Sequence, residues 1–224
     1  MSNDPLAFAN ATGILSVWNE YPAEDEAFYE RWYMTEHFPE RLGVPGFVRG
    51  RRYRAIDADR TYFTFYDLTN PDVVFSEAYL ARLNDPTAWT QRIMGRWTGM
   101  FRTVCRRLAR SGSAVGGFAV VARFEDQAAL SRGQAEALRM SLADPAVVAV
   151  DLWQATVEQN AATREASSRK EADKTISAAV VVETTSELSA RRVMDALPGH
   201  LGRDAVPTAI GLYGLIAMQD GPHR

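Results

Sequence analysis

The sequence predicts an α+β fold of two consecutive β-α-β-β-α-β units whose antiparallel sheets face each other. Three observations favour this fold. Short segments with the two-residue apolar period of strands alternate with segments of helical period. The order strand, helix, strand, strand, helix, strand occurs twice in the 224 residues. Pro45 and Pro145 each stand just before a predicted strand, so the two halves align at these prolines.

The first half supplies six elements. A β-branched and aromatic run predicts a strand, and acidic residues then begin a helix that carries Phe28, Trp32 and Tyr33 at helical spacing. Two strongly alternating runs follow, separated by polar hairpin residues at 57–60. In chain order, the predicted strands are 12–19, 46–56, 60–68 and 99–108, and the predicted helices are 23–38 and 71–83. This order is the ferredoxin-like arrangement.

The second half repeats the order with smaller residues. Its predicted strands are 116–124, 146–155, 176–184 and 209–219, and its predicted helices are 126–142 and 186–197. The segment 156–175 is polar and has no apolar period, which predicts a long surface excursion, either mobile or an extension of a strand. We therefore expect tandem ferredoxin-like repeats, 1–112 and 113–224.

Composition excludes several classes of function. A formal net charge of −3 and a pI near 5.7 provide no field that would gather nucleic acid or an anionic membrane surface. The arginine-rich segment 92–110 contains no recognition motif, which favours a solvated or interface surface. The expected partners are a small-molecule substrate and a second copy of the chain, as a homodimer.

The cysteine content and the N-terminal residues indicate in which cellular compartment the protein is expected. Cys105 is the single cysteine, expected to be a core or barrel-lining thiol, and no Cys/His spacing resembles a structural zinc site. The first residues lack the basic and apolar regions of a signal peptide, and no apolar run approaches the roughly 20 residues that span a bilayer. The sequence therefore predicts a cytoplasmic protein without a bound metal.

Alignment of the two halves at the prolines places candidate chemistry in the first repeat. The aligned pairs are Glu36 with Glu136, His37 with Ala137, Arg49 with Ala149, Arg51 with Asp151, and Tyr53 with Trp153. The second half keeps the corner and loses most polar groups of the first. This difference is typical of a duplicated unit in which one copy retains a site.

The two faces of each predicted sheet have different neighbours. In a β-α-β-β-α-β unit both helices cover one face, so the other face is buried against the second sheet. Alternation then predicts that Phe63 and Phe65 face the helices. The set expected to face the opposite sheet is Tyr62, Thr64 and Tyr66, together with Phe47, Arg49, Arg51 and Tyr53 as the favoured parity of the preceding strand. With Trp18, this space has the composition of a small-molecule site.

One stretch resembles a known family. The residues "WYMTEHFPERLGVPGFVRGRRY", Trp32 to Tyr53, look like the W-Y-x-x-E-H-x-P-E-R-L-x-x-P-G-F signature of proteins in the dimeric α+β barrel superfamily, similar to EthD-like and related uncharacterised barrel families. The resemblance implies sheets that pair into a barrel around a small cavity. Its members include cofactor-free monooxygenases, lactone isomerases, dehydratases, decarboxylases and haem-binding branches, so function does not follow from the fold.

His37 is the strongest catalytic candidate. Imidazole titrates near neutral pH and can take and return a proton, as dehydration, isomerisation or decarboxylation of an activated carbonyl compound requires. The alternative is a histidine placed near a helix C-terminus, where the dipole favours it. Neighbours on a helix point about 100° apart, so Glu36 is expected to form a salt bridge with Arg41 or another basic residue and not to orient His37.

Other candidates come from the strands. Arg51 and Tyr66 are expected to stabilise an enolate or phenolate, the first through its guanidinium and the second through its hydroxyl. Each has a structural alternative, a solvated strand face for the arginines and plain packing for the tyrosines. The residues expected to bind substrate or shape the pocket are Trp18, Asn19, Tyr33, Arg49, Tyr53 and Tyr62.

These candidates predict a cofactor-independent lyase or isomerase acting on a small aromatic or polyketide-like carbonyl compound. A cofactor-free monooxygenase and a non-catalytic module that binds a hydrophobic ligand remain alternatives. No cofactor is expected, although His200 is a candidate haem or metal ligand because the resemblance includes haem-binding branches. His223 lies in the predicted C-terminal tail.

Overall fold

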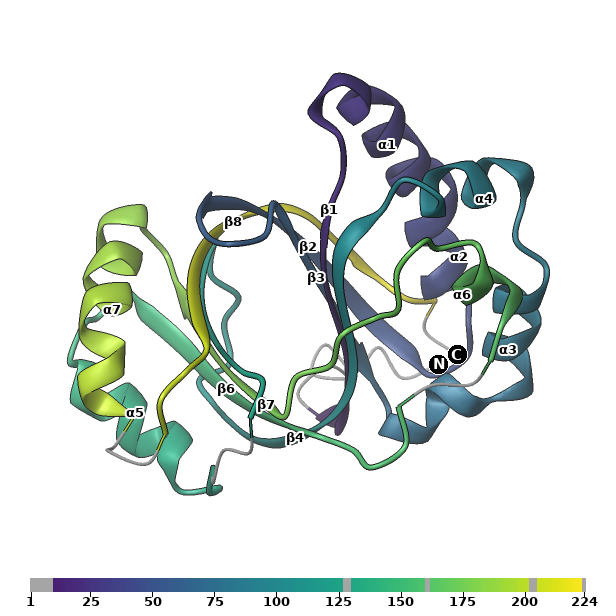
Figure 1. Ribbon diagram of the computed structural model, residues 1–224. Helices are drawn as coiled ribbons and strands as arrows, with labels where there is room; N and C mark the ends of the chain where they lie inside the picture. Colours follow the sequence, from purple (N-terminus) through teal and green to yellow (C-terminus); the bar gives the residue numbers. More distant parts are fainter. Residues whose placement is uncertain (1–9, 127–129, 160–161, 202–204, 223–224) are drawn as a thin grey trace.

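The computed structural model describes residues 10–126, 130–159, 162–201 and 205–222. Its centre is a closed barrel of eight antiparallel strands in the order β1-β3-β2-β8-β5-β7-β6-β4, with helices outside the barrel (Figure 1). The prediction of an α+β barrel is confirmed. The expectations for the N-terminal residues 1–9, for 127–129 within the second-half helix and for His223 lie outside the described residues.

All eight predicted strands are present. They are β1 (Gly13–Glu20), β2 (Phe47–Asp57), β3 (Tyr62–Leu68), β4 (Thr98–Ser111), β5 (Phe118–Phe124), β6 (Val147–Ala155), β7 (Ala178–Thr184) and β8 (Ala209–Asp220). β2 pairs with β8, and β4 pairs with β6. The barrel therefore closes within one chain, a point that the sequence leaves open.

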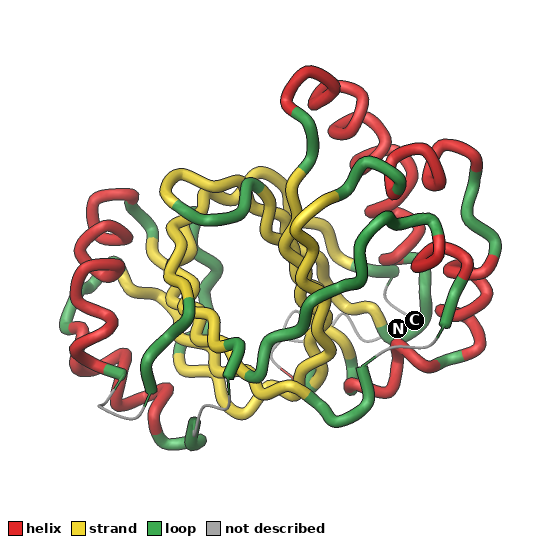
Figure 2. Tube along the Cα trace, in the orientation of Figure 1, coloured by secondary structure: helices red, strands yellow, loops and turns green. Residues whose placement is uncertain are grey.

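The helices form two groups on opposite sides of the barrel (Figures 1 and 2). The α-helices are α1 (Glu26–Trp32), α2 (Phe38–Leu42), α3 (Glu77–Asn84), α4 (Ala88–Met94), α5 (Gln134–Leu142), α6 (Arg164–Ser167) and α7 (Glu187–His200). Short helical segments are η2 (Ala23–Asp25), η3 (Tyr33–His37) and η4 (Pro71–Phe75). Helix α4 was not predicted, because its few residues are too short to reveal a period. No helix among the described residues is long and apolar enough to cross a membrane.

The core has one inner part and two outer parts. The lumen of the barrel is filled by a cluster drawn mainly from the strands, with Trp18, Tyr53, Phe63, Phe65, Trp153 and Tyr213 as its large rings. A second cluster lies between the first-half strands and helices α1 to α4, and a third lies between the second-half strands and helices α5 and α7. The barrel is a packed core with aromatic side chains in its interior.

The predicted orientation of β3 is wrong. Phe63 and Phe65 point into the lumen, whereas Tyr62 and Tyr66 belong to the cluster beneath the helices. The orientation of β2 is right for Arg51 and Tyr53 but not for Phe47, because a bulge between Phe47 and Arg49 shifts the register. His37 and Tyr66 therefore share the helix-covered side of the sheet, and Arg51 lies on the other side.

Candidate functional site

A widened helical turn places His37. Helix α1 continues through the π-helical segment η3 into α2 without a break. Pro39 follows closely and cannot donate a backbone hydrogen bond, and its ring crowds the carbonyl four residues before it, which disfavours a regular α-helical turn there. π-helical turns change the direction of side chains and are frequent at functional sites. Here both Tyr33 and His37 are buried against the sheet.

The imidazole of His37 lies among aromatic rings. Its ring centroid is 4.5 Å from that of Trp32, 5.1 Å from Tyr33 and 6.2 Å from Trp97. The side chain is 6% exposed. Burial, with further contributions from Arg41, Arg52 and Arg169, holds the pKa of His37 well below its ordinary value. The ring is consequently neutral at physiological pH and can accept a proton.

Four residues that each carry a buried polar atom without a hydrogen bond line one small cavity. Within the part of the chain that the structure describes, no hydrogen-bond partner is present for Nδ1 of His37, Oη of Tyr66, Nη1 of Arg41 or Nε1 of Trp97. The cavity holds about 30 Å³, the share of one water molecule in liquid water. Each unsatisfied buried group costs roughly 1–3 kcal/mol, and such groups are rare in native proteins. Four beside one cavity indicate a site built for a polar ligand.

A larger cavity of about 320 Å³ lies next to the small one. It is lined by η4, α3 and residues of the segment that follows β6, and the two cavities share Arg102, Glu165 and Arg169. A volume of this size falls in the range of small-molecule sites. We refer to the two as the inner and outer cavities.

Arg41 and Tyr66 both keep their protons at the inner cavity. Burial disfavours the charged form of Arg41, but the carboxylates of Glu165 and Glu40, with Tyr79, raise its pKa above the ordinary value. Burial and the nearby Tyr33 raise the pKa of Tyr66 well above its ordinary value, so the phenol keeps its proton. The cavity therefore combines a neutral base, a permanent cation, and O–H and N–H donors.

Glu36 positions the aromatic wall and does not pair with Arg41. Its Oε1 accepts hydrogen bonds from the indole of Trp32 at 3.2 Å and from the hydroxyls of Thr87 and Thr90 at 2.6 and 2.9 Å. Arg41 instead forms ion pairs with Glu40 and Glu165. The expected salt bridge of Glu36 is absent from the described contacts, and the carboxylate joins α4 to η3.

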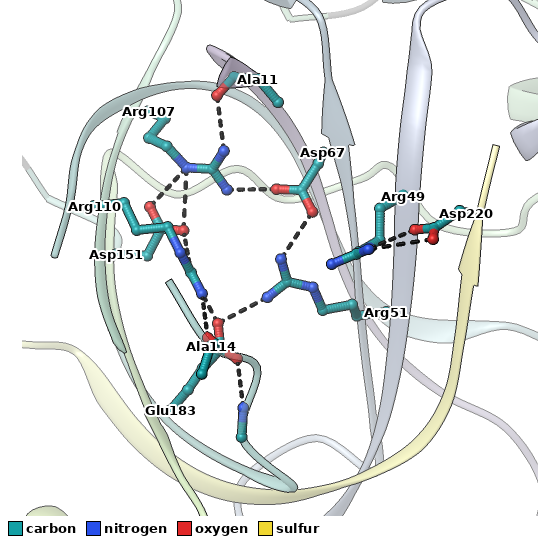
Figure 3. A network of polar contacts seen from close by, with 11 residues as sticks. Ala11, Arg49, Arg51, Asp67, Arg107, Arg110, Ala114, Asp151, Glu183 and Asp220 are labelled. Atoms are coloured by element: carbon teal, nitrogen blue, oxygen red, sulfur yellow. Dashed lines mark hydrogen bonds and ion pairs between the residues drawn. The ribbon is translucent and has the colours of Figure 1, made fainter. Parts of the chain in front are cut away.

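Arg51 lies in a charge network that fills one end of the lumen (Figure 3). Its guanidinium is 3.0 Å from Asp67 and 2.7 Å from Glu183. The whole network consists of three arginines and three carboxylates, which are Arg51, Arg107 and Arg110 with Asp67, Asp151 and Glu183. Burial alone would lower the pKa of Arg51, but these carboxylates raise it. The structure does not bring Arg51 together with His37, because its guanidinium is paired in the lumen, on the opposite side of the sheet.

The remaining predicted site residues are dispersed. Tyr33 lines the inner cavity and donates a hydrogen bond to Thr64 at 3.2 Å. Away from the inner cavity, Trp18 and Tyr53 lie in the lumen, Asn19 bonds with Tyr29, Tyr62 donates to Glu26, and Arg49 pairs with Asp220 at the rim of β2 and β8. Of the predicted set, the structure brings together His37, Tyr66 and Tyr33.

Sequence reasoning missed Arg41, Trp97, Arg102, Glu165 and Arg169. The position of Arg41 one helical turn after His37 is a signal that could have identified it. Glu165 lies in the polar excursion, and no local pattern connects it with a residue 124 positions earlier.

The described surroundings of the histidines do not fit a haem. The inner cavity is far smaller than a macrocycle, and rings enclose the imidazole of His37. His200 is exposed at the end of α7, beside a cavity of about 290 Å³ whose described lining includes no arginine or lysine to pair with propionates. In the described ranges, no cluster of three His, Cys, Asp or Glu residues could hold a metal ion.

No family model matches the sequence, and no curated protein matches it. Solved structures do match over nearly the whole chain. An anthrone oxidase-like protein aligns with a TM-score of 0.58 at 7% identity, covering 94% of this chain and 93% of its own. A protein assigned as a chlorite dismutase aligns at 0.53 and 14%, covering 92% and 96%. One assigned as a monooxygenase, from Fusobacterium nucleatum, aligns at 0.51 and 10%, covering 94% and 95%.

Identities this low establish the architecture and leave the chemistry to the residues of this chain. The chain thus has the fold of the dimeric α+β barrel proteins, closed here within one polypeptide.

Proposed function

We propose that the inner cavity carries out cofactor-independent proton transfer on a small aromatic or polyketide-like carbonyl compound, in a lyase or isomerase reaction with His37 as the base. One observation carries the proposal. The neutral imidazole of His37 has a free Nδ1 and lines the same cavity as three unused donors on Tyr66, Trp97 and Arg41.

The proposed reaction begins at an acidic C–H bond next to the carbonyl group. Nδ1 of His37 takes the proton, and the electron pair of the C–H bond moves onto the carbonyl oxygen as an enolate. The hydroxyl of Tyr66, the indole N–H of Trp97 and the guanidinium of Arg41 are donors for this oxygen. Several donors in a buried site stabilise the developing charge more than they would in water.

The low pKa of His37 favours return of the proton. An imidazolium buried near Arg41 is unfavourable, so it passes its proton on rapidly. In an isomerisation the proton goes to another carbon of the enolate. In a dehydration the enolate expels a hydroxyl group, which leaves as water with the proton from the imidazolium. Either sequence restores neutral His37 and balances atoms and charge.

A cofactor-free monooxygenase is the second candidate. The same deprotonation produces an electron-rich enolate or phenolate, which is the species that reacts with dioxygen without a cofactor. Two structures of the same fold are of an anthrone oxidase-like protein and of a protein assigned as a monooxygenase, which supports testing this reaction. A ligand-binding module without turnover is the remaining alternative.

The test is turnover of a panel of cyclic 1,3-diketones, anthrones and hydroxylated aromatic ketones, with and without dioxygen. We expect His37→Gln to abolish turnover and the matched variant His200→Gln, at an exposed site on α7, to retain it. Consumption of one dioxygen per product would select the monooxygenase, and equal rates under argon would select the lyase or isomerase. Full activity in His37→Gln would reject the base assigned here.

Four further expectations from the sequence remain predictions. They are the division into ferredoxin-like repeats at 112/113, membership of an EthD-like family, the homodimer and the cytoplasmic location. Sedimentation equilibrium of the purified chain would test the homodimer directly. The proposed chemistry does not depend on that result, because the inner and outer cavities are lined by one chain.

A further inference from the structure

The segment between β6 and β7 crosses the barrel to cover the first-half helices (Figure 1). Its ends are attached to β4, where Thr156 N donates to Val104 O at 3.0 Å and Lys174 N donates to Met100 O at 2.9 Å. Between these attachments, α6 contacts α3 and α4. A part of the second half of the chain thus forms the outer wall of a site built by the first half.

Glu165 is the residue of α6 that lines the inner cavity. It is 7% exposed and forms an ion pair with Arg41, which is 2% exposed. Glu165 also lines both the inner and outer cavities. Its carboxylate therefore stands at the junction between the cavity beside His37 and the space that leads outward.

The inner cavity is too small for the proposed substrates while Glu165 occupies this position. Its volume is about 30 Å³, whereas an apolar cavity that binds benzene measures roughly 150 Å³. The adjacent outer cavity of about 320 Å³ provides the missing space once the side chain at the junction moves. Three side chains line both cavities, Arg102, Glu165 and Arg169, and among them Glu165 is the one paired with Arg41 of the inner cavity.

Among the residues that the structure describes, displacement of Glu165 would leave the buried guanidinium of Arg41 with the more distant Glu40, at 3.7 Å, as its remaining carboxylate partner. A buried charge that loses its close partner is strongly unfavourable. A ligand carboxylate removes this penalty, because its oxygens can pair with the guanidinium of Arg41 as the carboxylate of Glu165 does. A neutral ligand brings no charge to pair with Arg41 and leaves the penalty in place. The other ion pair at the outer cavity, Arg169 with Asp173 at 2.7 Å, need not break.

We infer that Glu165 occupies the position of a substrate carboxylate, so that the site selects aromatic or polyketide-like carbonyl compounds that carry a carboxylate and exchange it for Glu165 on Arg41. This inference rests on the proposed function in one respect, which is that the inner cavity beside His37 is the substrate site. Its exchange step is non-covalent: one carboxylate leaves Arg41, another binds, and the net charge beside His37 is unchanged.

The test uses 1-naphthoate and its neutral analogue 1-naphthamide, followed by calorimetry and by quenching of tryptophan fluorescence. Glu165→Gln retains the shape of the side chain and removes its charge, so we expect it to bind 1-naphthoate at least tenfold more tightly than the wild-type protein does. Affinity for 1-naphthamide should change less than threefold. Glu171→Gln is the matched control. The substitution removes the same charge, and Glu171 lines the outer cavity but not the inner one.

Two results would overturn the inference. One is an equal gain in 1-naphthoate affinity in Glu165→Gln and Glu171→Gln, which would indicate a general charge effect. The other is an equal gain for 1-naphthamide, which would indicate removal of a steric block without carboxylate selection.

A measurement on the wild-type protein applies even when Glu165→Gln fails to fold. Amide exchange in α6 depends on hydrogen bonds such as Ser167 N to Thr163 O at 3.0 Å. Saturating 1-naphthoate should accelerate exchange at 166–168, because the anchor at Glu165 is released, and unchanged or slower exchange contradicts the inference. Neither probe has to react. If turnover depends on His37 but the site does not prefer carboxylates, this inference fails and the proposed function stands. If carboxylates exchange for Glu165 but no substrate is turned over, the proposed function fails and this inference stands.

Discussion

Trp32 packs against His37 with ring centroids 4.5 Å apart and ring planes tilted by 31°, and the indole N–H of Trp32 donates to Glu36 and Thr90 at 3.2 and 3.1 Å. Glu36 and Thr90 thus hold the indole of Trp32, the aromatic wall of the candidate site, and support His37 indirectly through that ring. Such indirect support is typical of sites whose geometry has to be maintained closely.

The anchor can be tested with Thr90→Val. The threonine hydroxyl donates to Glu36 and accepts from Trp32, and valine of the same shape does neither. We expect unfolding in urea to show a loss of about 1–3 kcal/mol, because a half-buried carboxylate and a buried indole each lose a partner. Thr35→Val is the control, since its hydroxyl donates to the carbonyl of Arg31 on the exposed face of the same helical stretch. An equal or greater loss in the control would contradict a special role for the buried hydroxyl.

Acid should destabilise the protein through His37. The folded protein has a lowered pKa at this residue, so the unfolded chain binds the proton more readily. The stabilising contribution is present above the unfolded pKa near 6.5 and is lost as pH falls below it, by up to about 1.4 kcal/mol per pH unit until the lowered folded pKa is reached.

The measurement is the free energy of unfolding in urea between pH 5 and 8. His37→Gln should reduce the slope below pH 6.5 relative to the wild-type protein, and His200→Gln, at an exposed site, serves as the control. Identical slopes for wild type and His37→Gln would show that the imidazole is not held neutral by burial.

Two arginines of β2 should differ sharply in their contribution to stability. Arg51→Met leaves Asp67 paired with Arg107 alone and Glu183 paired with Arg110 alone. The buried network then holds three carboxylates and two arginines, and we expect a loss of roughly 3–5 kcal/mol in the free energy of unfolding. Arg49→Met breaks a rim pair whose Asp220 is 43% exposed, which is worth about 1 kcal/mol or less. Because Arg51 faces the lumen, ligand affinity at the inner cavity should be unchanged in any folded Arg51→Met. A specific loss of that affinity would restore Arg51 as a site residue.

Two tyrosines of β3 offer a matched pair for the oxyanion role. Tyr66→Phe removes a donor that has no partner among the described residues, so stability should change by less than about 1 kcal/mol while kcat falls roughly 10²- to 10³-fold. Tyr62→Phe removes a hydroxyl that donates to Glu26 at 2.7 Å. It should lower stability by about 1 kcal/mol and leave kcat unchanged. Retention of kcat in Tyr66→Phe would remove Tyr66 from the proposed reaction.

The sequence by itself determined the strands, most helices and their order. Apolar period is a local property, so β3 and β7 can be identified from a few residues. The "EH" of the helix-to-strand corner also identified His37 as a residue to examine. The aligned pair Arg51 and Asp151 predicted a loss of chemistry in the second half of the chain. What looked like loss of a polar group is a pair of opposite charges in one lumen network.

Tertiary structure decided which face of each strand meets which neighbour. β3 is buried along its whole length, and both of its faces carry aromatic residues, so alternation could not distinguish lumen from helix layer. The bulge in β2 changed its parity in a way that only the pairing with β3 reveals. The contact of Arg41 with Glu165 joins residues 124 positions apart. Closure of the barrel brings such residues together, and no local pattern in the sequence encodes that distance.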